Sequence, residues 1–173
     1  MKWIQAIKPV ARDAGRCEVC PLSRVKAGVA VRILDPAQAD LDEHLRLVRL
    51  IGAKHGVEHF YPDGAFQEFQ LGLGDAARII EVRLGDRLLG VGVCLLDAHR
   101  LHFWTCGVDY GAAPGFSPFY VLYYEALRHA IDLGVPVFEC GRRNGVFKSR
   151  YGMRPVPLLA YLAPTSRSLV SGR

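Results

Sequence analysis

The stretch of residues 117–152, SPFYVLYYEALRHAIDLGVPVFECGRRNGVFKSRYG, decides the fold. It predicts a helix over residues 118–133, because Ser117 is a favourable N-cap and Pro118 occupies the first helical position, where a missing N–H costs nothing. Apolar residues then recur at helical spacing. The apolar run at 135–140 predicts a short buried strand that returns parallel to the strand before the helix.

The segments around this stretch complete a mixed α/β pattern. The expected elements, in chain order, are a strand over 29–34, a helix from Asp40 to near Gly56, helical turns over 65–71, strands over 78–84, 87–96 and 101–109, the helix and strand named above, a short helical loop, and a closing strand over 158–162. This order predicts an α/β (α+β) fold whose mixed sheet has an antiparallel meander and one right-handed β-α-β crossover.

The composition fits one globular domain. The chain has 173 residues, of which 50% are hydrophobic, and its mean hydropathy is +0.12. We expect a domain over residues 40–164, with 1–39 as an N-terminal extension or flap and 165–173 as a flexible tail. No apolar run reaches the length of a membrane span, and the first residues lack the apolar core of a signal peptide, so a cytoplasmic location is expected.

The charge is moderately basic, with a formal net charge of +5 and a pI near 9.1. Lysines and arginines are dispersed along the chain, which argues against free nucleic acid as the main ligand. The same charge suits a site for a phosphate-bearing cofactor.

Five cysteines in a chain without a secretory signal indicate free thiols rather than a disulfide framework. Cys17 and Cys20 form a CEVC pair, but a zinc site would need two further ligands at matching spacing, so no metal is expected. Cys94, Cys106 and Cys140 each stand alone in a predicted strand. A nucleophilic role for Cys140 is disfavoured because no histidine is near in sequence.

The C-terminal half resembles the GNAT N-acyltransferase fold, and most closely the C-terminal half of Fem-type and cellulose-biosynthesis-type GNAT-like acyltransferases. Their pattern is a tyrosine-rich helix, A-x-x-x-G, a strand that ends in glycine, K-x-x-x-G and a closing strand. The matching residues here are Tyr123, Tyr124, Ala130, Gly134, Gly141, Lys148 and Gly152. The topology resembles the family over about residues 60–163, and the motif over 117–162. The resemblance implies a transferase that moves an acyl or aminoacyl group to the amine of a small molecule or peptide.

The resemblance also implies a donor site at the start of the crossover helix. GNAT enzymes that use acetyl-CoA carry an Arg/Gln-x-x-Gly-x-Gly/Ala turn there, and the corresponding loop here is GAAPGFS, residues 111–117. The loop leads to a helix N-terminus, whose N–H groups and dipole favour an anion. The expected donor-binding residues in it are Gly111, Gly115, Phe116 and Ser117. Because Pro114 and Pro118 remove two N–H donors, the donor stays open between acyl-CoA (acetyl-CoA) and aminoacyl-tRNA.

Direct acyl transfer to an amine needs a base, an N–H on the carbonyl oxygen and an acid for the leaving group. Glu139, near the end of the crossover strand, is the expected base or substrate anchor, and Asp109 is a second carboxylate candidate. Tyr151 is the expected acid, with Lys148 and Arg142 as anion binders. The alternatives are an inward Glu139 paired with an arginine, and a basic loop that is merely solvated.

Two other functions fit the same pattern. One is a GNAT-like binding module that has lost catalysis. The other is an N-end-rule aminoacyl-tRNA-protein transferase, because CEVC followed by AVRI at residues 30–33 resembles the N-terminal segment of those enzymes.

Overall fold

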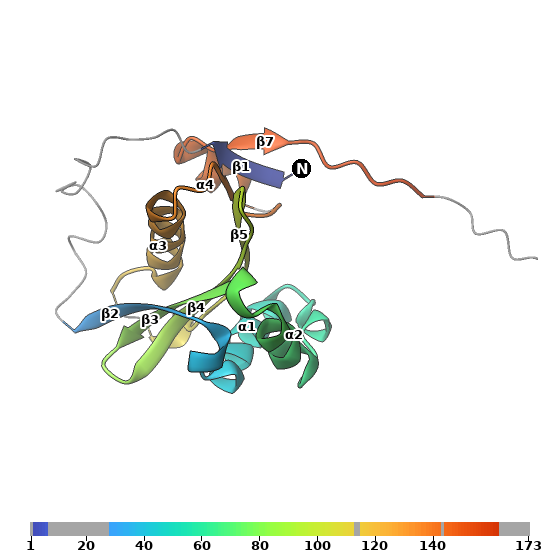
Figure 1. Ribbon diagram of the computed structural model, residues 1–173. Helices are drawn as coiled ribbons and strands as arrows, with labels where there is room; N and C mark the ends of the chain where they lie inside the picture. Colours follow the sequence, from blue (N-terminus) through green and yellow to red (C-terminus); the bar gives the residue numbers. More distant parts are fainter. Residues whose placement is uncertain (1, 7–27, 113–114, 143, 163–173) are drawn as a thin grey trace, which may run out of the picture.

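The computed structural model describes residues 2–6, 28–112, 115–142 and 144–162, so the CEVC pair and the expected tail lie outside the described residues. Seven strands form one mixed sheet in the order β2-β3-β4-β5-β6-β1-β7 (Figure 1). The strands are β1 (Lys2–Ala6), β2 (Val29–Leu34), β3 (Ala77–Leu84), β4 (Arg87–Leu96), β5 (Arg100–Val108), β6 (Val137–Glu139) and β7 (Arg154–Val156). The helices are α1 (Leu41–Lys54), α2 (Ala65–Leu73), α3 (Pro118–Asp132) and α4 (Gly145–Arg150), with short 3₁₀ turns η2 (Pro36–Gln38), η3 (Glu58–Phe60), η4 (Gly74–Ala76) and η5 (Tyr110–Ala112).

Local sequence signals place most of these elements. The Asp40 carboxylate accepts a hydrogen bond from the Glu43 N–H at 3.0 Å and so caps α1, as the sequence predicted. β2 and β4 have their predicted bounds, and β3, β5 and α3 differ from theirs by one residue at one or both ends. The β3–β4 hairpin turns at Gly85, whose φ of +57° is costly for other residues.

The end of the chain corrects the sequence analysis. Residues 158–162 form no strand; the last strand is instead β7, which is antiparallel to β1. β1, which was not expected, is also antiparallel to β6, so it occupies the position between β6 and β7. The sheet therefore takes two strands, β1 and β2, from the segment 1–39. The domain boundaries themselves stay a prediction.

β6 is shorter than the predicted strand over 135–140. The Val135 N–H bonds to the Ala130 carbonyl at 3.2 Å and so still belongs to the end of α3, while Pro136 has no N–H to give to a sheet.

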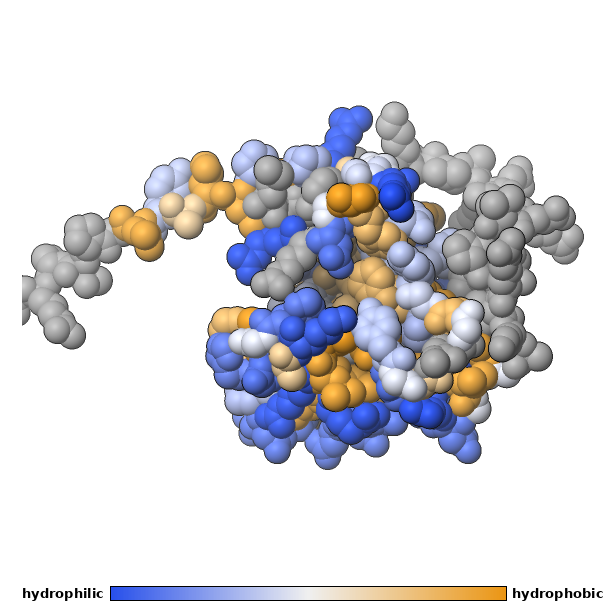
Figure 2. All heavy atoms as spheres, turned by 180° about the vertical axis from the view of Figure 1, so that it is seen from behind, coloured by the Kyte–Doolittle hydropathy of each residue, from blue (hydrophilic) through white to orange (hydrophobic). Residues whose placement is uncertain are grey.

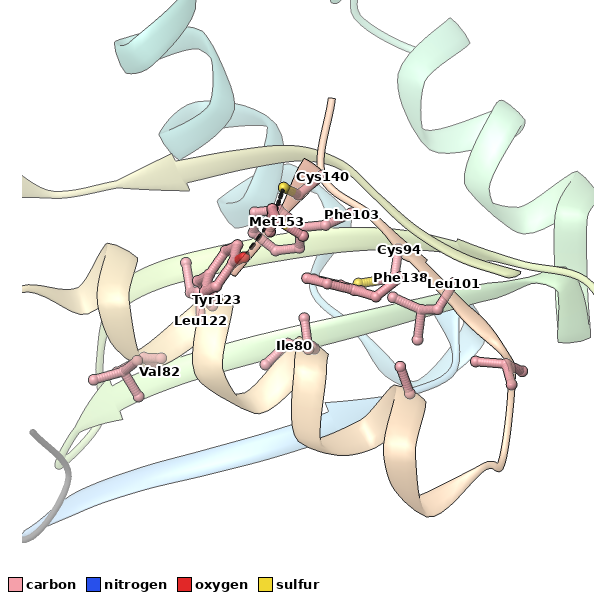
Figure 3. Packing of buried hydrophobic residues seen from close by; sticks show 14 of the residues in the cluster. Ile80, Val82, Cys94, Leu101, Phe103, Leu122, Tyr123, Phe138, Cys140 and Met153 are labelled. Carbon is pink, nitrogen blue, oxygen red and sulfur yellow. Dashed lines mark hydrogen bonds between the residues drawn. The ribbon is translucent and has the colours of Figure 1, made fainter. Parts of the chain in front are cut away.

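Helices cover both faces of the sheet (Figure 1). α3 packs on one face over a core that includes Ile80, Leu101, Leu122 and Phe138, all fully buried (Figure 3). On the other face, α1 and α2 cover a second cluster. Each such side chain contributes about 1.5–3 kcal/mol by leaving water, which makes these two layers the main source of stability.

The crossover that the sequence predicted is present. β5, α3 and β6 follow one another, and β5 and β6 pair in parallel, with Arg100 opposite Val137 and His102 opposite Glu139. Pairing ends at His102 and Glu139, although β5 continues to Val108. The mixed sheet and the parallel pair confirm the predicted fold class.

Candidate active site

The candidate site lies where β5 and β6 part, beyond His102 and Glu139; we call this region the splay. A bulge bends β5 there, because Val93 of β4 faces Thr105 and Cys94 faces Phe103, which leaves Trp104 without an opposite residue. In the part of the chain that the structure describes, β6 pairs with no residue of β5 past His102. The backbone of this β5 edge is thus available to a ligand.

Glu139 ends β6 at the splay and is only 7% exposed. Its carboxylate lies 3.0 Å from Arg100 Nη1 and 4.0 Å from His102 Nε2. Phe138 packs beneath α3, so strand alternation directs Glu139 to the opposite face. The pairing with an arginine that the sequence left as an alternative is present, and the His102 imidazole lies nearby.

Lys148 differs from a solvated loop cation because it is 5% exposed. Its Nζ donates to the Gly141 carbonyl at 3.1 Å, and burial lowers the pKa of the ammonium. The bond ties α4 back to the turn after β6, where Gly141 has a φ of +69°. Lys148 therefore shapes the loop that borders the splay.

Next to Lys148 lies a cluster of two sulfur atoms and a phenol (Figure 3). Tyr123 Oη donates to Met153 Sδ at 2.7 Å, and Cys140 Sγ lies 2.9 Å from the same sulfur. Burial raises the pKa of Cys140 to about 11, so its thiol is protonated at neutral pH. Because only the thiolate is a good nucleophile, the cluster favours a structural role for Cys140.

Replacing Lys148 with methionine should lower the free energy of unfolding by about 0.5–1.5 kcal/mol, because it keeps the apolar stem and removes one partly buried hydrogen bond. Urea denaturation measures this change. The matched control is Arg150→Met on the same helix, where an exposed side chain should leave stability within about 0.5 kcal/mol. Equal stability of K148M and wild type would contradict the structural role.

Tyr151 ends α4 and is 43% exposed. Its ring lies 4.7 Å from that of Phe147 and 5.7 Å from that of Tyr123. Packing thus holds one edge of the Tyr151 ring in place, and the rest of the side chain is exposed to solvent, as we expect of an acid at the border of a site. Arg142 is also exposed, beside the turn after β6.

The N-terminus of α3 is only partly open. The Tyr120 N–H bonds to the Ser117 carbonyl at 3.1 Å, whereas the Ser117 hydroxyl makes no capping bond. Within the described residues, the Phe119 N–H has no partner. Among the described residues, the Phe119 N–H is thus left for an anion at this helix N-terminus, and the Tyr120 N–H is not. Phe116 is half-buried against the core, and Gly115 before it is exposed with a φ of +79°.

Asp109 has a different environment from the other candidates. Its carboxylate accepts a hydrogen bond from Arg87 Nη2 at 2.9 Å. Arg87 lowers the pKa of Asp109, with further bonds from the N–H groups of Ala112 and Gly111. The lowered pKa makes Asp109 a weaker base, and its bonds close the loop after β5. Glu139 is also paired with an arginine, but it lies at the splay, so it stays the predicted base.

Sequence reasoning missed an aromatic wall on the Glu139 face of the sheet. The Tyr61 hydroxyl lies 2.9 Å from Thr105 Oγ1, and the Trp104 ring lies 5.2 Å from that of Phe69. Alternation along β5 puts Arg100, His102 and Trp104 on one face, but the bulge that brings Thr105 to the same face has no signal in the sequence.

The described residues contain no group of three or more side chains that could hold a metal ion. None of their helices combines the length and apolar character needed to cross a membrane. A groove of about 660 Å³ is lined by Asp42, Leu45, Arg46, Arg49, Leu50, Ala53, Glu58 and Asp63.

Comparison with solved structures supports the fold. An aminoglycoside acetyltransferase from an uncultured soil metagenomic sample, in complex with trehalose, is 13% identical with a TM-score of 0.58, over 81% of this chain and 99% of that one. A second such acetyltransferase is 16% identical with a TM-score of 0.58, over 80% and 99%. An acetyltransferase from Streptococcus agalactiae is 12% identical with a TM-score of 0.54, over 81% and 94%. No curated protein sequence matched the chain.

The family model of the acetyltransferase (GNAT) domain matches residues 21–149, which is more than half of the chain. The match spans the meander, the crossover and most of α4, and so includes both strands of the splay. It does not bear on the closer resemblance to Fem-type enzymes, which stays a prediction. From this match, the mixed sheet and the parting of β5 and β6, we conclude that the chain belongs to the GNAT acetyltransferase family and is an acetyltransferase-type enzyme.

Proposed function

We propose that this protein transfers an acyl group from acyl-CoA, such as acetyl-CoA, to the amine of a small molecule or peptide. The observation that carries the proposal is the splay: pairing of β5 with β6 ends at His102 and Glu139, and the rest of β5 runs on to Val108, whose partner Gly90 lies beside the start of α3. Acyl-CoA would supply an activated thioester carbonyl. The protein then needs to bind anionic phosphates, orient the carbonyl and take a proton from the amine.

The residues on the α3 side fit such a donor. Three features at the start of α3 favour the binding of a phosphate group. They are the Phe119 N–H, the Ser117 hydroxyl, which makes no capping bond, and the helix dipole. The exposed Arg142 adds a cation, and the free backbone edge of β5 can bind an extended chain. One N–H donor is fewer than a glycine-rich turn provides, so we expect weaker binding than such a turn would give.

The opposite face of the sheet fits the acceptor. Glu139 with His102 would take a proton from the substrate ammonium, so that the neutral amine can attack the thioester carbonyl. The wall of Trp104 and Phe69 would bind the apolar part of the substrate. Tyr151 would protonate the departing thiolate. Two of the similar structures are aminoglycoside acetyltransferases, which is consistent with an amine acceptor.

Glu139→Gln should lower kcat/KM for acyl transfer by about 10–100-fold, because the amide keeps its shape but cannot accept the proton. The assay follows acylation of a panel of primary amines by mass spectrometry. The matched control is Glu68→Gln, an exposed carboxylate on α2 that should leave kcat/KM unchanged.

Calorimetry with acetyl-CoA separates the enzyme from a binding module. Micromolar binding by wild type and E139Q alike, with slow transfer in the variant only, supports the proposed roles. Full activity of E139Q would remove Glu139 as the base. An absence of binding at millimolar acetyl-CoA would instead favour a non-catalytic module or an aminoacyl-tRNA donor.

A further inference from the structure

The exposed Arg154 of β7 lies on the same face of the sheet as Glu139. Both residues are opposite Ile4 of β1, and opposite residues on neighbouring strands point to one face. Alternation along β7 agrees, because Met153 packs in the core beneath α3, where it accepts a hydrogen bond from Tyr123. Arg154 therefore points to the opposite side. Figure 2 shows strongly hydrophilic side chains around the point where the chain leaves β7.

Arg100 adds a second guanidinium group to this face. Its Nη1 lies 3.0 Å from the Glu139 carboxylate, and its side chain is 42% exposed. Its Nε is buried and has no hydrogen-bond partner among the described residues. A buried N–H without a partner is costly, so this donor favours a further anion. At these strand positions the described residues thus provide two arginines and His102, but one carboxylate.

We propose that the acceptor is an α-amino acid with a large apolar side chain, and that Arg154 and Arg100 bind its carboxylate. This inference rests on the proposed acyl transfer and names the class of amine that receives the acyl group. The amine of the amino acid lies at Glu139 and His102, its carboxylate toward β7, and its side chain against the aromatic wall. Arginine suits the second contact because its planar group binds a carboxylate through two parallel N–H donors.

The spacing of these groups suits an amino acid. Neighbouring strands lie about 4.8 Å apart, so the backbone of Arg154, two strands from Glu139, is roughly 10 Å from it, and the long arginine side chain shortens that gap. Trp104 is two residues past His102 along β5, a distance of roughly 7 Å. Carboxylate and side chain therefore leave the amine in different directions, as the groups on an α carbon do.

The reaction stays the proposed acyl transfer. Glu139 takes one proton from the ammonium of the amino acid. The nitrogen then bonds to the thioester carbonyl carbon, the C–S bond breaks, and the second proton passes through Tyr151 to the departing thiolate. The products are an N-acyl amino acid and a free thiol, and the carboxylate held by the arginines is unchanged.

A polycationic acceptor fits this face poorly. Two of the similar structures are aminoglycoside acetyltransferases, and an aminoglycoside carries several ammonium groups. Like charges near Arg100 and Arg154 would oppose its binding. The two enzymes are 13% and 16% identical to this chain, a level at which the likeness shows the fold and not the acceptor.

The test compares kcat/KM for phenylalanine, phenylalaninamide, alanine and the aminoglycoside sisomicin, with acetyl-CoA as the donor. Phenylalanine should exceed its amide, which lacks the carboxylate, by at least about 50-fold, and alanine by about 10-fold. In Arg154→Met the preference for phenylalanine over its amide should fall below about 5-fold, because KM for phenylalanine rises while kcat stays the same. The matched control is Arg150→Met, an exposed arginine on α4, which should keep the wild-type preference.

The outcomes separate this inference from the proposed function. A preference that R154M retains, or equal kcat/KM for phenylalanine, its amide and sisomicin, overturns the inference and leaves acyl transfer in place. If no acceptor is acylated, the proposed function fails, and calorimetry with phenylalanine still decides the inference. Binding to wild type that is at least about 10-fold weaker in R154M supports the carboxylate site. Equal binding by both proteins, or binding by neither, overturns it.

Discussion

Replacing Gly107 with alanine should lower the free energy of unfolding by about 3 kcal/mol or more. A Cβ at this position of β5 would lie 2.4 Å from the Leu47 carbonyl carbon and 2.5 Å from the Val48 backbone nitrogen. Those atoms belong to α1 and cannot rotate away as a side chain can, so the helix would have to move off the sheet. Overpacking against backbone is among the costliest single changes to a core.

The control for this variant is Gly72→Ala. Gly72 lies in α2, and an added Cβ there would have no heavy atom within 4 Å. Since alanine is the better helix former, stability should be unchanged or higher by about 0.5–1 kcal/mol. Both variants are compared by urea midpoint at constant slope. If G107A were as stable as G72A, α1 could not approach β5 as closely as described. The packing of α1 and α2 on the sheet face that carries Glu139 would then also be wrong.

The second large effect concerns a buried charge network between α1 and β3. His44 Nε2 lies 2.7 Å from Glu81 Oε1, and Arg83 Nε donates to Glu81 Oε2 at 2.8 Å. Arg83 also pairs with Glu43 at 2.7 Å. His44 and Glu81 are 0% and 1% exposed, so Glu81→Ala would leave two cationic or polar partners without their carboxylate. We expect a loss of about 3–5 kcal/mol in the free energy of unfolding.

The same carboxylate should make stability depend on pH. Burial alone would raise the pKa of Glu81, but hydrogen bonds from His44 and Arg83 outweigh it and lower the pKa from 4.5 to about 2. Because the folded-state pKa is the lower one, the stabilisation is fully present above pH 4.5 and is lost as the pH falls toward 2. It amounts to about 3 kcal/mol.

In Glu81→Gln the fall in stability between pH 4.5 and 2 should therefore be shallower than in wild type, when both are followed by thermal unfolding. Glu68→Gln, on the exposed side of α2, provides the matched control and should keep the wild-type slope. Parallel curves for wild type and E81Q would contradict the lowered pKa.

Much of the fold follows from local sequence signals. The cap at Asp40, the proline at the first position of α3 and the turn at Gly85 are short-range effects, and the chain forms them much as the sequence predicts. The crossover also follows, because a helix between two apolar strands favours a parallel return. For the same reason, Glu139 and Tyr151 could be proposed as site residues from their places at element ends.

The sheet partners of the chain ends were decided only by tertiary structure. The sequence 158–162 has the apolar character of a strand, yet strand formation needs a partner edge, and β1 occupies the place between β6 and β7. β1 itself lies far from β6 in sequence, so no local pattern shows their pairing.

The features of the candidate site can also be separated into those that the sequence predicts and those that depend on tertiary structure. The residue types at the splay are visible in the sequence. Their environments are not, because they depend on residues distant in the chain: Lys148 is buried, Glu139 pairs with Arg100, and Arg87 binds Asp109 and weakens it as a base. Periodicity and capping depend on neighbours within a few residues, whereas charge, burial and the bulge at Trp104 depend on what the rest of the chain packs against them. The sequence by itself thus determined the order and kind of the elements, and tertiary packing determined which of their polar groups remain available for chemistry.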